Sequence, residues 1–168
     1  VFASNGAYTS VIVRQEPPKM PVGSKEFRPH RMSVAIYDLV NEKLVRRKAQ
    51  ELDVSGPSTS IEAFTGEKEG ALILINDGDL SYGKIRFDQA SIKTLISKLS
   101  GVEEPLTRAL CWSATWDMLR DAEISASDFI DIAIAGLPGE DDITTVTVLG
   151  NQLSGAVEIY AADRNRDL

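Results

Sequence analysis

The residue types that most often carry catalysis or hold a transition metal are nearly absent from this sequence. The chain has one histidine, His30, and one cysteine, Cys111. A single cysteine excludes an internal disulfide, and the two residues together exclude the common zinc sites, which use three or four Cys and His ligands. We therefore assign no catalytic, cofactor-binding or metal-binding residue from spacing and composition.

The pattern that comes closest to a metal site is Asp77-Gly78-Asp79. With Asp88 at the twelfth position, the segment resembles a calcium-binding EF-hand loop. Such a loop needs glycine at its sixth position, where this sequence has Tyr82, and helices on both sides, where it has strand-like residues. Asp and Gly are also the residues of tight turns. We expect a hairpin turn here and no calcium site.

For two charged runs and two single residues we prefer a structural role to a functional one. The acidic residues 140–142 are expected to cap a helix rather than to bind a hard cation. His30 is expected at a strand edge rather than as a catalytic base, and Cys111 as a small buried hydrophobe. The basic run 46–48 is expected to point to both faces of a strand and to be solvated.

Charge divides the chain into two parts. The formal net charge is −7, which argues against a nucleic-acid partner because such affinity comes mainly from Lys and Arg. Residues 1–87 carry 12 basic against 11 acidic side chains, a net of +1, and residues 88–168 carry 6 against 14, a net of −8. This shift predicts two domains, 1–87 and 88–168.

The sequence gives two further expectations about the context of the chain. No apolar run approaches the ~18 residues needed to span a bilayer, so we expect no membrane partner and a cytoplasmic protein. The sequence begins at Val1 and its first methionine is Met20, from which we expect a piece of a longer chain.

The first part reads as short strands separated by turns. Thr, Val, Ile and alternating apolar residues favour strands, and Asn41-Glu42 is a plausible hairpin tip. The run 71–75 is continuously apolar, which fits a central strand. Six strands at this spacing favour an antiparallel β-sandwich, with the strands expected over 8–15, 31–39, 44–54, 59–64, 71–75 and 82–87.

After Asp88 the hydrophobic period changes from 2 to 3.6, which predicts four helices. Asp88 can cap the first, and Pro105 suits the first turn of the second. Ser125 and Asp128 make a capping box for the third, and Asp142 can cap the fourth. Short loops between them suggest α-helical hairpins, the start of an α-solenoid.

Several strings, in their order, resemble the bacterial aminopeptidase N family of zinc metallopeptidases. The resemblance covers nearly the whole chain, and its specificity lies in the ordered set rather than in any one string. The strings are YTSVIVRQEPP from Tyr8, RPHRMSVAIYDL from Arg28, LVRRKAQELDVSG from Leu44, LILINDGDLSYGKIRFD from Leu72, ALCWSATWDMLRDAE from Ala109 and LPGE from Leu137.

The resemblance implies a non-catalytic role for this chain. The family removes single residues from peptide N-termini with zinc held by H-E-x-x-H and a later Glu in an upstream catalytic domain, and G-x-M-E-N grips the substrate amine. None of these motifs occurs here. The implied fold is the family's β-sandwich followed by the first helices of its C-terminal domain. The implied partners are that upstream domain and, through it, peptides.

Two hypotheses remain open about what this part does. By resemblance the sandwich is a spacer and the helices are part of a cap over the peptide-binding cavity, where the net −8 of residues 88–168 would favour a positively charged peptide N-terminus. The alternative is a free-standing protein-interaction module with no peptidase role.

Overall fold

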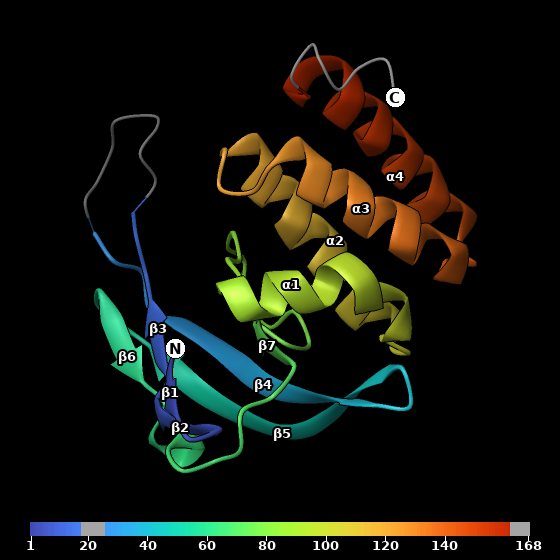
Figure 1. Ribbon diagram of the computed structural model, residues 1–168. Helices are drawn as coiled ribbons and strands as arrows, with labels where there is room; N and C mark the ends of the chain where they lie inside the picture. The colour runs from blue at the N-terminus through green and yellow to red at the C-terminus, as the bar shows by residue number, and fades with distance from the viewer. Residues whose placement is uncertain (18–25, 162–168) are drawn as a thin grey trace.

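The computed structural model describes residues 1–17 and 26–161, in which strands come first and helices follow (Figure 1). The strands are β1 (Phe2–Ser4), β2 (Ala7–Ser10), β3 (Ile12–Arg14), β4 (His30–Val40), β5 (Lys43–Val54), β6 (Ser58–Ser60) and β7 (Leu72–Ile75). The α-helices are α1 (Gln89–Lys98), α2 (Pro105–Arg120), α3 (Ala126–Gly136) and α4 (Ile143–Gly155). Shorter helical turns are η1 (Glu62–Phe64), η2 (Leu99–Gly101), η3 (Leu137–Gly139) and η4 (Ala156–Tyr160).

Every strand pairing within the described sheets is antiparallel. The largest sheet has the order β5-β4-β7, and two-stranded sheets form from β1 with β2 and from β3 with β6. Asn41 and Glu42 make the tip of the β4–β5 hairpin with positive φ angles of 49° and 67°, as a tight primed turn requires. The antiparallel class and this hairpin are confirmed, whereas closure into a sandwich stays a prediction.

Four strand predictions were wrong in whole or in part, three of them in the position or length of a strand. The expected strand 8–15 is broken at Val11 into β2 and β3, because the pairing partner changes there from β1 to β6. The expected strand 59–64 is β6 followed by η1, which buries Ile61 and Phe64 on one turn. The run 71–75 gives β7, which has one paired neighbour in the described sheet and is not central.

The segment 82–87, expected as a sixth strand, forms no ladder. Its alternation comes from packing against α2 instead: Ile85 and Phe87 are buried in the core shared with that helix, and the backbone N–H of Phe87 contacts the Met118 sulfur. Apolar residues at every second position indicate that alternate side chains are buried. A helix can bury alternate residues of an extended segment as well as a sheet can.

The sheet β5-β4-β7 has an apolar core on each face. On one face, Val34 and Ile36 of β4 pack with Tyr8, Phe64 and neighbours from the first strands. On the other face, Ala35 and Tyr37 belong to a cluster that reaches through all four α-helices. This explains why β7, although an edge strand here, is a continuous apolar run: both of its faces are covered.

The helix predictions are confirmed at their first turns. The Asp88 side chain accepts from the Ser91 amide, Pro105 opens α2, and Ser125 with Asp128 forms a complete capping box. Asp142 accepts from the Thr145 amide, so the β-branched start of α4 is helical. The helices stack away from the sheet, with α1 nearest to it and α4 farthest (Figure 1). The solenoid and the 87/88 domain boundary stay predictions.

No helix in the described ranges 1–17 and 26–161 is both long and apolar enough to cross a membrane.

Candidate functional site

The segment Asp77-Gly78-Asp79, whose sequence resembles a calcium-binding loop, forms a turn between the sheet and the helices. Asn76 and Gly78 have positive φ angles of 61° and 89°, and the Asp79 amide donates to the Asn76 carbonyl at 2.8 Å. The turn follows β7 directly. The predicted Asp/Gly turn is therefore confirmed, but the expectation of a hairpin is wrong, because the next element after β7 in the described residues is α1 and not a strand.

Asp77 lies at the centre of this junction with its side chain 1% exposed. The Tyr37 hydroxyl of β4 donates to Asp77 Oδ1 at 2.8 Å, and Arg46 Nη1 of β5 donates to Oδ2 at 2.9 Å. The Thr107 hydroxyl of α2 lies 3.5 Å from Oδ1. One carboxylate thus collects partners from two strands and a helix.

The electrostatics of this junction raise the pKa values of its phenol and of its guanidinium. Burial raises the pKa of the Tyr37 phenol far above its ordinary value, and the neighbouring Asp77 carboxylate raises it further, so Tyr37 stays a hydrogen-bond donor. The hydrogen bond to Asp77 raises the pKa of Arg46. A carboxylate whose two oxygens are occupied by such donors serves positioning rather than proton transfer.

A second contact holds the β4–β5 hairpin tip against the connection between α1 and α2. Glu42 pairs with Lys98 and Lys43 pairs with Glu103. A Cβ added at Gly101 would overlap the Glu42 carbonyl oxygen, so glycine permits this close approach. The hairpin is long enough to reach the helices because β4 and β5 pair over eleven positions.

A third contact joins the segment after β7 to the end of α2. Lys84 donates to Asp121 Oδ2 at 2.8 Å, and Arg86 pairs with both Asp121 and Glu123. The Lys84 ammonium and the Arg86 guanidinium beside Asp121 hold the pKa of that carboxyl below its ordinary value. Asp77, the hairpin tip and Asp121 therefore connect the helical part to the β part at three separate contacts, which we call the three junctions.

The acidic run 140–142 proved only partly to be a helix cap. Asp142 caps α4, and its hydrogen bonds with the Thr145 amide lower its pKa, while Asp141 is 96% exposed. Glu140, by contrast, has its side chain 4% exposed and pairs with Arg108 Nε at 2.9 Å. It also accepts a hydrogen bond from the Trp112 indole at 2.8 Å. The expected cap role is wrong for Glu140.

The basic run 46–48 points to both faces of β5, as predicted, but its members are paired rather than simply solvated. Arg46 reaches Asp77 on the helix side. On the other side Arg47 contacts Asp38 at 3.4 Å and Lys48 pairs with Glu67 at 2.7 Å. A bulge between Ile36 and Tyr37 of β4 leaves Arg47 without a direct partner residue in the ladder.

His30 and Cys111 take the places expected for them. His30 opens β4 and its Nδ1 lies 3.3 Å from the Ser81 hydroxyl, which is a strand-end position. Cys111 is fully buried in the helix-facing core, and burial raises the pKa of its thiol to about 12. A thiol in this environment is protonated and unreactive at neutral pH.

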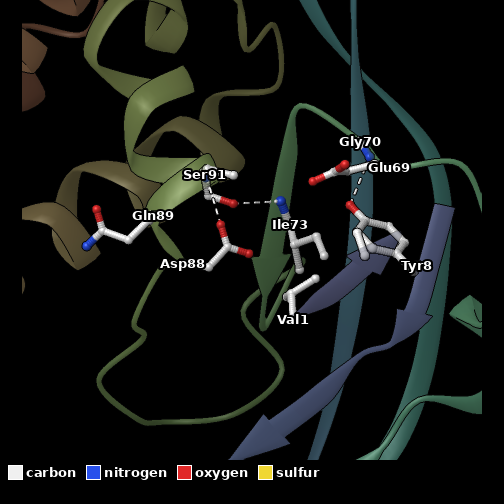
Figure 2. A pocket seen from close by; sticks show the side chains of 10 residues that line it. Val1, Tyr8, Glu69, Gly70, Ile73, Asp88, Gln89 and Ser91 are labelled. Atoms are coloured by element: carbon white, nitrogen blue, oxygen red, sulfur yellow. Dashed lines mark hydrogen bonds between the residues drawn. The ribbon is translucent and has the colours of Figure 1, made fainter. Parts of the chain in front are cut away.

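A hollow of about 330 Å³ lies between the first strands and the start of α1 (Figure 2). Its polar groups mostly bond to one another. The Gly70 amide donates to the Tyr8 hydroxyl at 2.8 Å, the Ile73 amide to the Ser91 hydroxyl at 3.0 Å, and the Ser91 amide to Asp88 at 2.7 Å. The bond between Ile73 and Ser91 joins β7 to α1, so the hollow lies beside the contact between these two elements.

A zinc ion has no fitting donor set in the described part of the chain. Within residues 1–17 and 26–161, no three His, Cys, Asp or Glu side chains lie close enough together to hold a metal ion. The buried carboxylates of Asp77 and Glu140 face hydroxyl, guanidinium and indole donors instead. The prediction that this chain carries no catalytic or metal-binding residue stays a prediction.

Sequence reasoning missed the partners of Asp77 and Glu140. A usable signal existed for Asp77, because a carboxylate directly after a buried apolar strand requires donors. Glu140 gave no such signal, since its partner Arg108 is 32 residues away and lies within a helix.

Two sequence comparisons with known proteins identify the family of this chain. The sequence model of the ERAP1-like C-terminal domain family matches residues 72–168. Aminopeptidase N of Streptomyces lividans is 40% identical over 98% of this chain, which confirms the resemblance to the aminopeptidase N family. The chain spans 20% of the length of that relative. It belongs to the family described as the ERAP1-like C-terminal domain.

Proposed function

We propose that this chain is the non-catalytic C-terminal portion of a zinc-dependent aminopeptidase, in which the β part is a spacer and the helices form part of a cap over a peptide-binding cavity. The observation that carries the proposal is the 40% identity to Aminopeptidase N across 98% of the chain. The catalytic domain and the zinc ion belong to another part of the parent chain, and the parent acts on peptides in the cytoplasm.

The three junctions support the spacer role. A cap has to keep its position relative to the cavity, because catalysis depends on placing groups to within a fraction of an ångström. Asp77 draws Tyr37, Arg46 and Thr107 into one buried contact, and the hairpin tip and Asp121 add contacts at a distance from it. Such a junction transmits the position of the β part to the helices.

The charge of the helical part supports a role toward peptides. Residues 88–168 have a net charge of −8, and an acidic wall raises the local concentration of a cationic peptide N-terminus. Exposed acids include Asp131, Asp141 and Glu158. Reversing these three to Lys in the parent enzyme should raise KM for peptides with a basic first residue more than for neutral ones. Equal KM values before and after would remove the charge-steering part of the proposal.

The experiment that tests the proposal uses the full-length parent protein. It should release single residues from peptide N-termini, lose this activity with a zinc chelator and regain it with added zinc. Asp77→Ala should then change the preference between short and long peptides, because a loosened cap excludes long peptides less well. Glu62→Ala, which alters an exposed acid of η1 outside the three junctions and outside the acidic helical part, is the matched control.

A parent protein without aminopeptidase activity would refute the proposal as a whole. A parent that is active, but whose peptide-length preference is the same in Asp77→Ala as in the unaltered enzyme, would refute the spacer and cap roles alone.

A further inference from the structure

The loop that leaves the Asp77 turn presents two large apolar side chains to solvent. Leu80 is 53% exposed and Tyr82 is 100% exposed. An exposed leucine is ordinary, but a fully exposed tyrosine loses all the burial that its ring could contribute. The ring of Tyr82 therefore contributes no packing to the part of the chain that the structure describes.

The backbone around these two side chains is nevertheless held in place. The Asn76 side chain accepts from the Ser81 amide at 3.0 Å and donates to the Ser81 carbonyl at 2.6 Å. The Ser81 hydroxyl lies 3.3 Å from His30 Nδ1. On the other side of Tyr82, Lys84 is tied to Asp121. The loop is thus fixed on both flanks.

A fixed loop with exposed apolar side chains has the properties of a binding anchor. Tyrosine supplies a large contact area at a small entropy cost, because only two side-chain torsions have to be fixed. Pre-organisation of the backbone removes the ordering cost that a flexible loop would carry. The phenol also needs a hydrogen-bond partner when it is buried. The complementary surface is an apolar pocket with a hydrogen-bond acceptor at its base.

We infer that Leu80 and Tyr82 dock into such a pocket on another domain of the same parent chain. This inference rests on the proposed function. Two side chains are too small for a stable complex between separate proteins, which buries at least about 1,000 Å² in total. Within one chain, tethering gives an effective concentration in the millimolar range, so a small anchor suffices. The chain spans 20% of its relative, which leaves four-fifths of a parent of that length to supply the pocket.

The test is chemical modification of Tyr82 in the full-length parent, followed residue by residue with mass spectrometry. Tetranitromethane nitrates exposed tyrosines, and the denatured protein gives the rate for full exposure. We expect Tyr82 to react at least about tenfold more slowly in the native parent than in the denatured one, in the range of the buried Tyr37. A native rate within about twofold of the denatured rate overturns the inference.

Two variants of the parent give an independent readout. Tyr82→Ser removes a side chain that is fully exposed in the described structure, so a loss of thermal stability would have to come from a contact elsewhere in the parent. We expect a lower Tm for Tyr82→Ser, with Tyr82→Phe retaining most of the stability. An unchanged Tm in Tyr82→Ser overturns the inference.

Dilution of the protein shows whether the pocket belongs to another domain of the same chain or to a second copy. Protection by a domain of the same chain is independent of protein concentration, whereas protection that fades on dilution would mean a second copy and would overturn the inference. Peptidase activity is measured on the same sample. A parent that protects Tyr82 but hydrolyses no peptide refutes the proposed function and leaves the docking intact.

Discussion

Arg108 and Glu140, 32 residues apart in the chain, form an ion pair in which the two side chains are 9% and 4% exposed. Arg108 also donates to the carbonyl oxygens of Val102 and Glu103, and Glu140 accepts from the Trp112 indole. The pair therefore joins α2, the chain before α2 and the chain before α4. A buried pair is tolerated because each charge has further hydrogen-bond partners.

Removing one member of this pair is expected to destabilise the protein strongly. Glu140→Ala leaves the Arg108 guanidinium buried without its carboxylate, which costs about 3–5 kcal/mol. Urea denaturation followed by far-UV circular dichroism measures the change in unfolding free energy. Glu62→Ala is the control, since Glu62 is an exposed acid of η1 far along the chain from Arg108 and should change the unfolding free energy by no more than about 0.5 kcal/mol. Equal midpoints for both variants would contradict this account of Glu140.

The Tyr37–Asp77 contact predicts a non-additive pair of substitutions. Tyr37→Phe removes a donor to a buried carboxylate and should cost about 1–3 kcal/mol, and Asp77→Asn should also destabilise because Arg46 loses its charged partner. The double variant should cost less than the sum, with a coupling of about 0.5–3 kcal/mol. A double-mutant cycle by urea denaturation measures it. Additive effects would show that the two side chains do not interact.

Two helical glycines should respond to alanine with opposite signs. A Cβ at Gly136 would lie 2.6 Å from the Trp112 ring, so Gly136→Ala forces the ring or α3 to shift and should cost about 1–3 kcal/mol. At Gly150 in α4 no atom lies within 4 Å of an added Cβ, so Gly150→Ala should stabilise by up to about 1 kcal/mol through helix propensity. Thermal unfolding of the two variants tests this, and a shift of the same sign in both would be inconsistent with the packing described.

The Asp121 ion pairs predict a pH dependence of stability. Lys84, together with Arg86, lowers the pKa of Asp121 below its ordinary value of 3.8. Because the folded-state pKa is depressed, the contribution is fully present above the ordinary pKa and is lost as the pH falls through the folded-state pKa. The unaltered protein should be more stable than Asp121→Asn at neutral pH, and this difference should shrink as the pH falls below the ordinary pKa and disappear once Asp121 is protonated in the folded state.

Urea denaturation at a series of pH values measures this difference. High salt should reduce it, because these side chains are partly exposed and their interaction is screened. A difference that persists unchanged at the lowest pH would contradict the assignment to ionised Asp121.

The helix starts could be predicted from the sequence because their causes are local. Asp88, Pro105, Ser125 and Asp142 each act on amides within their own first turn, and all four have the predicted position. The same holds for the Asn41-Glu42 tip, whose backbone angles are a property of two adjacent residues. Interactions that close within four residues leave a readable trace in the sequence.

The segment 82–87 and the acid Glu140 could not be predicted, because their state depends on distant residues. The alternation of Ile85 and Phe87 is the same whether a strand or α2 covers them, and only the fold placed Met118 beside Phe87. Glu140 looks like its neighbours in sequence, yet only the approach of Arg108 makes it the buried member of the run.

The sequence by itself determined the order of strands and helices, the helix caps, the turn at Asp77 and the family resemblance. Tertiary structure decided which carboxylates are buried and what they hold: Asp77 joins two strands to α2, and Glu140 joins α2 to the start of α4. The reason is physical. Backbone hydrogen bonding and capping are set by neighbours along the chain, whereas the burial of a charge depends on partners that the chain brings together only when it folds.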